Sequence, residues 1–165
     1  MARKTTHRTI LPSVLDRLID REPGNRAEPH SWRTQSLKEL KDSVRRDLEW
    51  LLNTRRTPAE APASAKELRR SVYHYGLPDS TGLALRSQEE RSRLARAVEA
   101  TISAFEPRLV NVSVSISPAA PAAKVVHFQI EALLRTEPAP ERVYFDSTLE
   151  LSSGEYEIEG ETRAG

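Results

Sequence analysis

The spacing of apolar residues changes at Pro107, and this change limits the possible folds more than any other feature of the sequence. Before Pro107, apolar residues recur at steps of three and four, the period of an amphipathic helix: Leu94, Val98, Ile102 and Phe105. After it, apolar residues alternate with polar ones, the period of a half-buried strand: Val110, Val112, Val114 and Ile116. The pattern predicts a helix that begins at Ser87, ends before Pro107 and leads directly into a β-strand.

Two further helices are predicted earlier in the chain. A short one is expected within residues 10–19, where four apolar residues share one helical stripe: Val14, Leu15, Leu18 and Ile19. A longer one is expected over residues 36–53, whose leucines repeat at three- and four-residue steps. Ser36 and Glu39 form a capping box at its start, and Ser87 begins the later helix with the same pattern. Residues 71–79 are typical of a loop packed onto the core.

More strands follow in the C-terminal half. Period-two alternation predicts strands over residues 124–134 and 143–151, and a turn then leads to a short strand at 156–158. Helices followed by sequential strands favour an α+β fold, with N-terminal helices packed on a largely antiparallel sheet formed by the C-terminal half. The last strands are expected near the sheet edge, where their glutamates discourage random pairing and leave the edge available to one chosen partner strand.

The length of 165 residues fits one compact domain rather than two. We expect a flexible extension over residues 1–9, a single domain over 10–160 and a tail over 161–165. Residues 57–65, rich in Pro and Ala, are predicted to form a linker or surface loop within that domain. The sequence shows neither a signal-peptide pattern nor an apolar run of about 20 residues, so a cytoplasmic protein without membrane insertion is expected.

Several classes of function find no support in the residues. There is no cysteine, and the four histidines are scattered without metal-ligand spacing. Neither a glycine-rich phosphate loop nor a nucleophile elbow is present. Residues 1–56 carry 13 Lys and Arg against 8 Asp and Glu but no set of stacking aromatics, so nucleic-acid binding is not expected. We expect a protein that is not an enzyme and that has no cofactor, metal or small-molecule substrate.

Glu106, Pro107 and Arg108 break local rules at the helix–strand junction. Pro107 disfavours the α conformation at Glu106, whose carboxylate faces the negative end of the helix dipole. Arg108 can compensate through an intrachain ion pair, or its planar fork can bind a group on another chain, and the residues alone leave both interpretations open. A glycosidase acid at Glu106 would need a second carboxylate, and the spacing selects none of the three candidates: Asp79, Glu131 and Asp146.

Five segments in order along the chain resemble the TssE family, a baseplate component of bacterial type VI secretion that is similar to the wedge protein of contractile phage baseplates. They are residues 13–18, 46–55, 75–79, 105–109 and 145–150. The sharpest is Glu106-Pro107-Arg108, set between a helix that ends in Phe105 and an alternating valine strand. The resemblance covers most of residues 10–160.

This resemblance implies a structural protein that links the wedge core, built from TssF and TssG, to the first ring of the contractile sheath, TssB and TssC, and that helps to initiate sheath assembly. It assigns contact with the wedge core to Glu106, Pro107 and Arg108. It assigns strand addition to the sheath to seven residues: Val143, Phe145, Asp146, Leu149, Leu151, Tyr156 and Ile158. It implies a location at the cytoplasmic side of the inner membrane. Because phage relatives carry a lysozyme label, a peptidoglycan-cleaving hydrolase is the alternative function.

Overall fold

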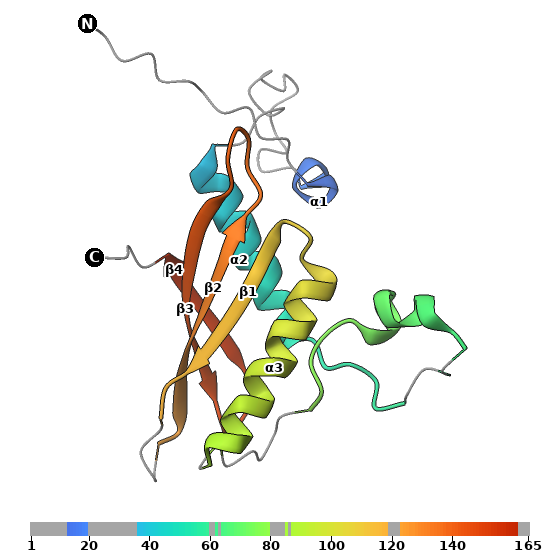
Figure 1. The fold of residues 1–165 in the computed structure, drawn as a ribbon, viewed down its shortest axis with the longest axis vertical. Coiled ribbons are helices and arrows are strands. Elements are labelled where there is room, and N and C mark those ends of the chain that lie inside the picture. The colour runs from blue at the N-terminus through green and yellow to red at the C-terminus, as the bar shows by residue number, and fades with distance from the viewer. Residues whose placement is uncertain are drawn as a thin grey trace, which may run out of the picture.

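The computed structural model describes residues 13–19, 36–59, 62, 64–79, 85, 87–118 and 123–161. The predicted extension over 1–9 and most of the predicted tail lie outside these residues. Along the chain (Figure 1) the elements are α1 (Val14–Leu18), α2 (Leu37–Asn53), the 3-10 helices η2 (Lys66–Arg70) and η3 (Val72–His74), α3 (Gln88–Phe105), β1 (Leu109–Ile116), β2 (Val125–Leu134), β3 (Glu141–Glu150) and β4 (Tyr156–Glu161). The predicted α+β class is confirmed.

The four strands form one antiparallel sheet in the order β1-β2-β3-β4. Ile130 of β2 lies opposite Val114 of β1 and Phe145 of β3, so consecutive strands are joined as a simple meander. β3 is an interior strand, whereas β1 and β4 are the edges. Of the last strands, which were expected near the sheet edge, β4 lies at the edge and β3 lies one strand in from it.

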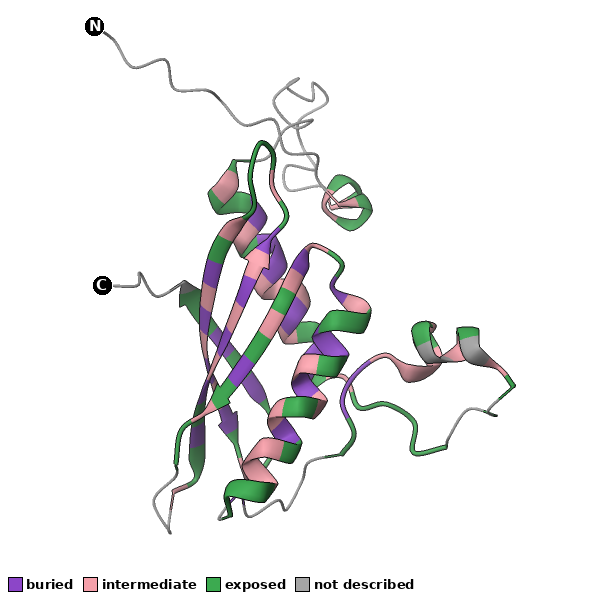
Figure 2. Ribbon diagram, in the orientation of Figure 1, coloured by how far each residue is buried: buried purple, intermediate pink, exposed green. Residues whose placement is uncertain are grey.

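The core lies between the sheet and the two long helices. α3 packs along β1, α2 packs along β4, and the two helices contact each other. Figure 2 shows buried residues alternating along the central strands and gathered on the inner sides of α2 and α3. Deeply buried apolar side chains from α2, α3, β2 and β3 make up much of this core, among them Val44, Leu48, Val98, Ile102, Ile130, Leu134, Val143 and Phe145. Burying each one stabilises the fold by about 1.5–3 kcal/mol.

Both long helices begin at the predicted capping boxes. The Ser36 hydroxyl accepts a hydrogen bond from the Glu39 N–H at 3.2 Å, and the Glu39 carboxylate accepts one from the Ser36 N–H at 2.7 Å. Ser87 and Glu90 make the same reciprocal pair at 3.1 and 3.0 Å. These bonds satisfy N–H groups that have no partner inside the helix, which is why both starts could be located from local sequence.

The N-terminal helix is shorter than the predicted apolar stretch. α1 has five residues, Ser13 caps it, and Ile19 is its C-cap. None of its residues is buried as a whole, and Val14 and Leu18 are 72% and 76% exposed. Among the described residues, the core therefore does not cover the apolar stripe of this helix.

The chain between α2 and α3 makes a long excursion, residues 55–77, that leaves the helix–sheet body and returns to it at the same place. Arg55 and Leu77 form an isolated bridge, and the Leu77 N–H donates to the Thr54 carbonyl at 2.8 Å. The intervening η2 and η3 project away from the sheet (Figure 1). Of the predicted packed loop, Leu77 is 2% exposed, whereas Val72 is 91% exposed. No helix among the described residues is long and apolar enough to cross a membrane.

Candidate functional site

The turn between α3 and β1 is the centre of the candidate site. Glu106 is the C-cap of α3, with backbone angles (φ −117°, ψ 83°) outside the α region, as expected before proline. Its side chain lies inside the molecule, because the residue is 4% exposed. Pro107 is exposed at the tip of the turn, and Arg108 is half-buried where β1 begins. The junction thus turns an acid inward and a proline outward.

Arg108 binds the buried carboxylate of Glu106. Its Nε donates to Glu106 Oε1 at 2.7 Å, its backbone N–H donates to the same oxygen at 3.1 Å, and its Nη2 donates to Glu106 Oε2. Both carboxylate oxygens are therefore held by one residue. The intrachain ion pair, one of the two interpretations left open by the sequence, is present and offsets the unfavourable position of the acid at the helix C-terminus.

The same guanidinium reaches across to α2. Arg108 Nη2 also donates to Asp47 Oδ2 at 2.5 Å, and Nη1 donates to the Ser43 hydroxyl at 3.1 Å. α2 and the α3–β1 junction are consequently joined by hydrogen bonds in addition to apolar packing. Since one side chain makes all of these contacts, the position of the turn depends on the position of α2.

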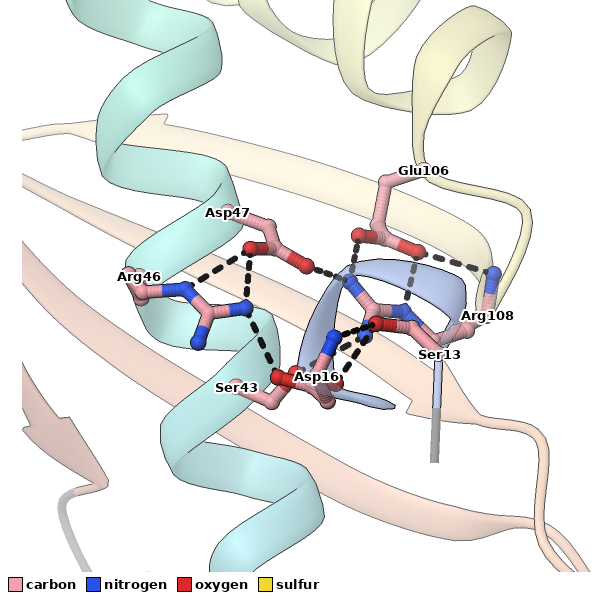
Figure 3. A network of polar contacts seen from close by, with 7 residues as sticks. All are labelled: Ser13, Asp16, Ser43, Arg46, Asp47, Glu106 and Arg108. Atoms are coloured by element: carbon pink, nitrogen blue, oxygen red, sulfur yellow. Dashed lines mark hydrogen bonds and ion pairs between the residues drawn. The ribbon is translucent and has the colours of Figure 1, made fainter. Parts of the chain in front are cut away.

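A second arginine extends the contacts to α1. Arg46 Nη2 donates to Asp16 Oδ1 at 2.9 Å and to Asp47 Oδ1 at 2.8 Å. Asp16 Oδ2 also accepts hydrogen bonds from the hydroxyls of Ser13, at 2.6 Å, and Ser43, at 2.8 Å. Figure 3 shows how side chains from α1, from α2 and from the α3–β1 junction converge. We call these seven residues the polar network: Ser13, Asp16, Ser43, Arg46, Asp47, Glu106 and Arg108.

Charge in the polar network is held in place by its hydrogen bonds. The network contains three carboxylates and two guanidinium groups. Burial opposes ionisation of Asp16, but hydrogen bonds from two serine hydroxyls and from Arg46 outweigh it and hold the pKa of this carboxyl well below its usual value. Burial likewise acts to lower the pKa of Arg108, but its bonds to Glu106 outweigh it and raise the pKa.

A surface groove of about 500 Å³ lies beside the polar network. Its apolar lining includes Leu15, Trp50 and Pro107, and four members of the network line it as well: Ser13, Asp47, Glu106 and Arg108. Trp50 is 51% exposed, and the Arg46 guanidinium lies 5.1 Å from the centre of its ring. The groove therefore combines accessible apolar surface with a charged lining that is already fixed in position.

Sequence reasoning identified Glu106 and Arg108 but missed their partners on the helices. Ser43 and Asp47 lie on the same face of α2 as the buried Leu40, Val44 and Leu48. Polar residues on an apolar helical face are a signal that they have partners inside the fold. That signal was present in the sequence, although it does not say which distant residue is the partner.

The three carboxylates considered as mates for a catalytic Glu106 have contacts of their own. Asp79 pairs with Arg55 at 3.3 Å, and Glu131 pairs with Arg142 at 3.2 Å. Asp146 accepts a hydrogen bond from Gln129 at 2.8 Å. None of the three belongs to the polar network that holds Glu106. Within the described part of the chain, no group of His, Asp and Glu suited to holding a metal ion is found.

Four of the residues assigned to strand addition lie on β3. Because β3 pairs with β2 on one side and β4 on the other, its backbone is engaged within the sheet. The side chains of Val143, Phe145 and Leu149 belong to the core. Asp146 alternates with them along the strand and is half-buried. It lies on the face of the sheet away from the core, where it accepts the hydrogen bond from Gln129.

The other three lie at or beyond the end of β3. Leu151 is half-buried in the turn that follows it. Tyr156 and Ile158 lie on β4, the edge strand, with side chains that are 2% and 1% exposed. What β4 exposes is therefore its glutamates, Glu157 and Glu159, rather than these two side chains.

Comparison with known proteins identifies the family. No curated protein matches the chain. A family model described as baseplate wedge protein gp25 matches residues 38–139, more than half of the chain. The matched stretch runs from α2 to the loop before β3 and contains the Glu106–Arg108 junction, whereas β3 and β4 lie beyond it. The chain thus belongs to the baseplate wedge protein gp25 family, whose members serve as structural components of a baseplate with other baseplate proteins as partners.

Proposed function

We propose that this protein is the TssE component of a type VI secretion baseplate. In this role it links the wedge core of TssF and TssG to the sheath proteins TssB and TssC and helps to initiate sheath assembly. Membership of the wedge family supports a baseplate role, and the five segments that resemble TssE favour the secretion system over a phage tail. The baseplate it joins would dock at the cytoplasmic side of the inner membrane.

The observation that carries the proposal is the groove beside the polar network. Pro107 and Trp50 offer apolar surface at its rim, while Glu106 and Arg108 are occupied with each other beneath it. Such a surface fits an apolar segment of a protein partner, because the fixed charges set its orientation and the aromatic ring supplies contact area. Glu106 and Arg108 would thus act mainly by holding Pro107 in position for the wedge core.

The sheath side of the proposal rests on β4. It is an edge strand at the opposite end of the sheet from β1, and its exposed Glu157 and Glu159 are gatekeeping charges against unselective pairing. An extended segment of a sheath subunit could add to this edge through backbone hydrogen bonds. Many copies of one modest contact around a ring would together hold the sheath firmly.

The structural role is favoured over the hydrolase by the state of Glu106. A glycosidase acid must present a carboxyl oxygen to the sugar, with a second carboxylate facing it. Here both oxygens of Glu106 accept hydrogen bonds from Arg108. Clearing of purified cell-wall sacculi, compared between the natural protein and Glu106→Gln, tests the alternative. Activity that disappears in the variant would establish the hydrolase.

Binding to a purified TssF–TssG complex tests the first contact. Trp50→Ala should leave the fold intact, since half of this side chain is exposed, and should weaken binding by at least about tenfold, as expected for an aromatic anchor. Val72→Ala removes an apolar side chain of η3 that is even more exposed than Trp50, and this variant should bind like the natural protein. Equal binding by the Trp50 and Val72 variants would reject the groove as the docking site. Arg108→Ala is a poor probe, because it leaves the buried Glu106 without its partner.

A further inference from the structure

One stripe of α2 faces the outer edge of β4. Arg45, Glu49 and Asn53 follow one another at four-residue steps, so they share one side of the helix. Arg45 Nη1 lies 3.4 Å from Glu49 Oε2. Arg45 and Asn53, at the two ends of the stripe, form hydrogen bonds to the backbone of β4. Side chains of a helix therefore meet the strand edge directly.

Asn53 binds Tyr156 as a neighbouring strand would. The Tyr156 N–H donates to Asn53 Oδ1 at 2.8 Å, and Asn53 Nδ2 donates to the Tyr156 carbonyl at 2.8 Å. The side-chain amide thus offers one acceptor and one donor to a single residue of the strand. This is the pattern that a residue of an antiparallel partner presents to its hydrogen-bonded mate.

The backbone groups of Tyr156 lie on the side of β4 that faces away from β3. The Glu150 N–H donates to the Glu155 carbonyl at 2.9 Å, and Thr148 lies opposite Glu157, so the bonds to β3 fall on odd-numbered residues of β4. Tyr156 and Ile158 lie between them and direct their backbone groups away from β3. Arg45 Nη1 donates to the Ile158 carbonyl at 3.2 Å. The two side chains occupy successive positions that an added strand would need.

The end of β4 beyond Ile158 is less crowded around its side-chain positions. A Cβ placed on Gly160 would meet no heavy atom within 4 Å. The register between β3 and β4 shifts between Ser147 and Phe145, which marks an irregularity in this part of the ladder. The hydrogen bonds from Arg45 and Asn53 fall on Ile158 and Tyr156, so an incoming strand would begin at Gly160, next to the occupied positions.

We propose that Arg45 and Asn53 form a side-chain latch that occupies the outer edge of β4 and is exchanged for the backbone of an extended strand from the sheath. The inference rests on the proposed attachment of the sheath to β4 and adds how that edge is regulated. While the latch is closed, the free protein does not pair through β4 with other strands, including those of its own copies. When the sheath strand begins at Gly160 and advances, its N–H and C=O groups replace the side-chain groups one for one.

The opposite edge of the sheet supplies a matched control. Glu99 of α3 accepts a hydrogen bond from the Val114 N–H of β1 at 2.8 Å, so it caps an edge strand from a helix in the same manner. The Glu99→Ala variant opens the β1 edge and leaves the latch on β4 in place. Arg93→Ala, at a side chain that is 80% exposed on α3, controls for the loss of a positive charge.

Amide hydrogen exchange measured by NMR tests the latch itself. In the Arg45→Ala/Asn53→Ala variant the Tyr156 amide should exchange about tenfold faster, because its acceptor is lost, while the Glu157 amide keeps its rate through its bond to β3. Asn53→Asp keeps the acceptor and loses the donor, so it should protect Tyr156 more than the double variant does. An unchanged Tyr156 rate in the double variant would overturn the latch.

Binding of a purified TssB–TssC sheath complex tests the exchange. The double variant should bind several-fold more tightly than the natural protein, whereas Glu99→Ala and Arg93→Ala should bind like it. Unchanged binding by the double variant, or a larger gain in Glu99→Ala, would overturn the proposal. If no form binds the sheath complex, sheath attachment itself fails, and sedimentation velocity then decides on the latch. Self-association of the double variant supports a guarded edge, and a monomer overturns it.

Discussion

Arg108 holds both carboxylate oxygens of Glu106, although a single residue, Pro107, separates them along the chain. The pair is local in sequence, but it becomes part of the tertiary structure because Arg108 also binds Asp47 of α2. A turn of three residues is thereby fixed to a helix about 60 residues earlier in the chain. The expected consequences of disturbing it differ from those at an exposed ion pair.

Replacing Arg108 with Ala should destabilise the protein by about 3 kcal/mol, the lower end of the range for breaking a buried ion pair. The Glu106 side chain is 6% exposed and would lose its cation, whereas Arg108 itself is 22% exposed. Urea unfolding followed by circular dichroism measures the change in unfolding free energy. Arg93→Ala, which breaks an exposed pair, should stay within about 0.5 kcal/mol of the natural protein. Equal stability of the two variants would contradict the role given to the Glu106–Arg108 pair.

The contribution of Asp16 to stability should depend on pH. Because the folded-state pKa of this carboxyl lies below its unfolded value, its contribution is complete above the unfolded pKa of about 4 and is lost progressively as the pH falls below it. The difference in unfolding free energy between the natural protein and Asp16→Asn should therefore shrink from pH 6 to pH 3. A difference that is constant over this range, or an NMR titration giving Asp16 an ordinary pKa, would reject the prediction.

Gly76 should not tolerate a side chain. Its φ is +98°, and a Cβ at this position would lie 2.1 Å from the Thr54 carbonyl oxygen, the acceptor of the Leu77 N–H. Gly76→Ala is expected to cost at least about 2 kcal/mol of stability, through strain and loss of this hydrogen bond. Gly160→Ala, where no heavy atom is within 4 Å, should change stability by less than about 0.5 kcal/mol. Thermal unfolding of the two alanine variants checks the contrast.

Removing the cap of α3 should weaken the helix that leads into the site. Ser87→Ala loses the hydroxyl that accepts from the Glu90 N–H and is expected to cost about 1 kcal/mol. Ser103→Ala makes the same substitution at an exposed position within α3 and should be neutral or slightly stabilising, since alanine has the higher helix propensity. Denaturant midpoints of the two variants give the comparison, and equal losses would argue against the cap.

The parts of the fold that could be predicted are those whose signals are local. The capping boxes at Ser36 and Ser87 involve residues three positions apart, and they marked the helix starts correctly. The alternation on either side of Ile130 likewise reports the two faces of one strand. The short helix expected within residues 10–19 is present as α1, but periodicity does not reveal what covers a face, and Val14 is 72% exposed.

The parts of the site that could not be predicted depend on contacts between distant segments. The Glu106–Arg108 pair could be predicted from the sequence because the two residues are only two positions apart. The bonds from Arg108 to Asp47 and from Arg46 to Asp16 join residues 61 and 30 positions apart. The Asn53–Tyr156 contact spans 103 positions. Such pairings follow from how the helices lie on the sheet, which no local pattern specifies.

The bridge between Arg55 and Leu77 also has a practical consequence. It brings the two ends of the excursion together, so the path of the chain in between does not determine how α2 meets the sheet. Residues 57–59, near the first end, are exposed. A fluorescent reporter or an affinity tag inserted there should leave the helix–sheet body unchanged, which would allow the protein to be followed inside an assembled baseplate.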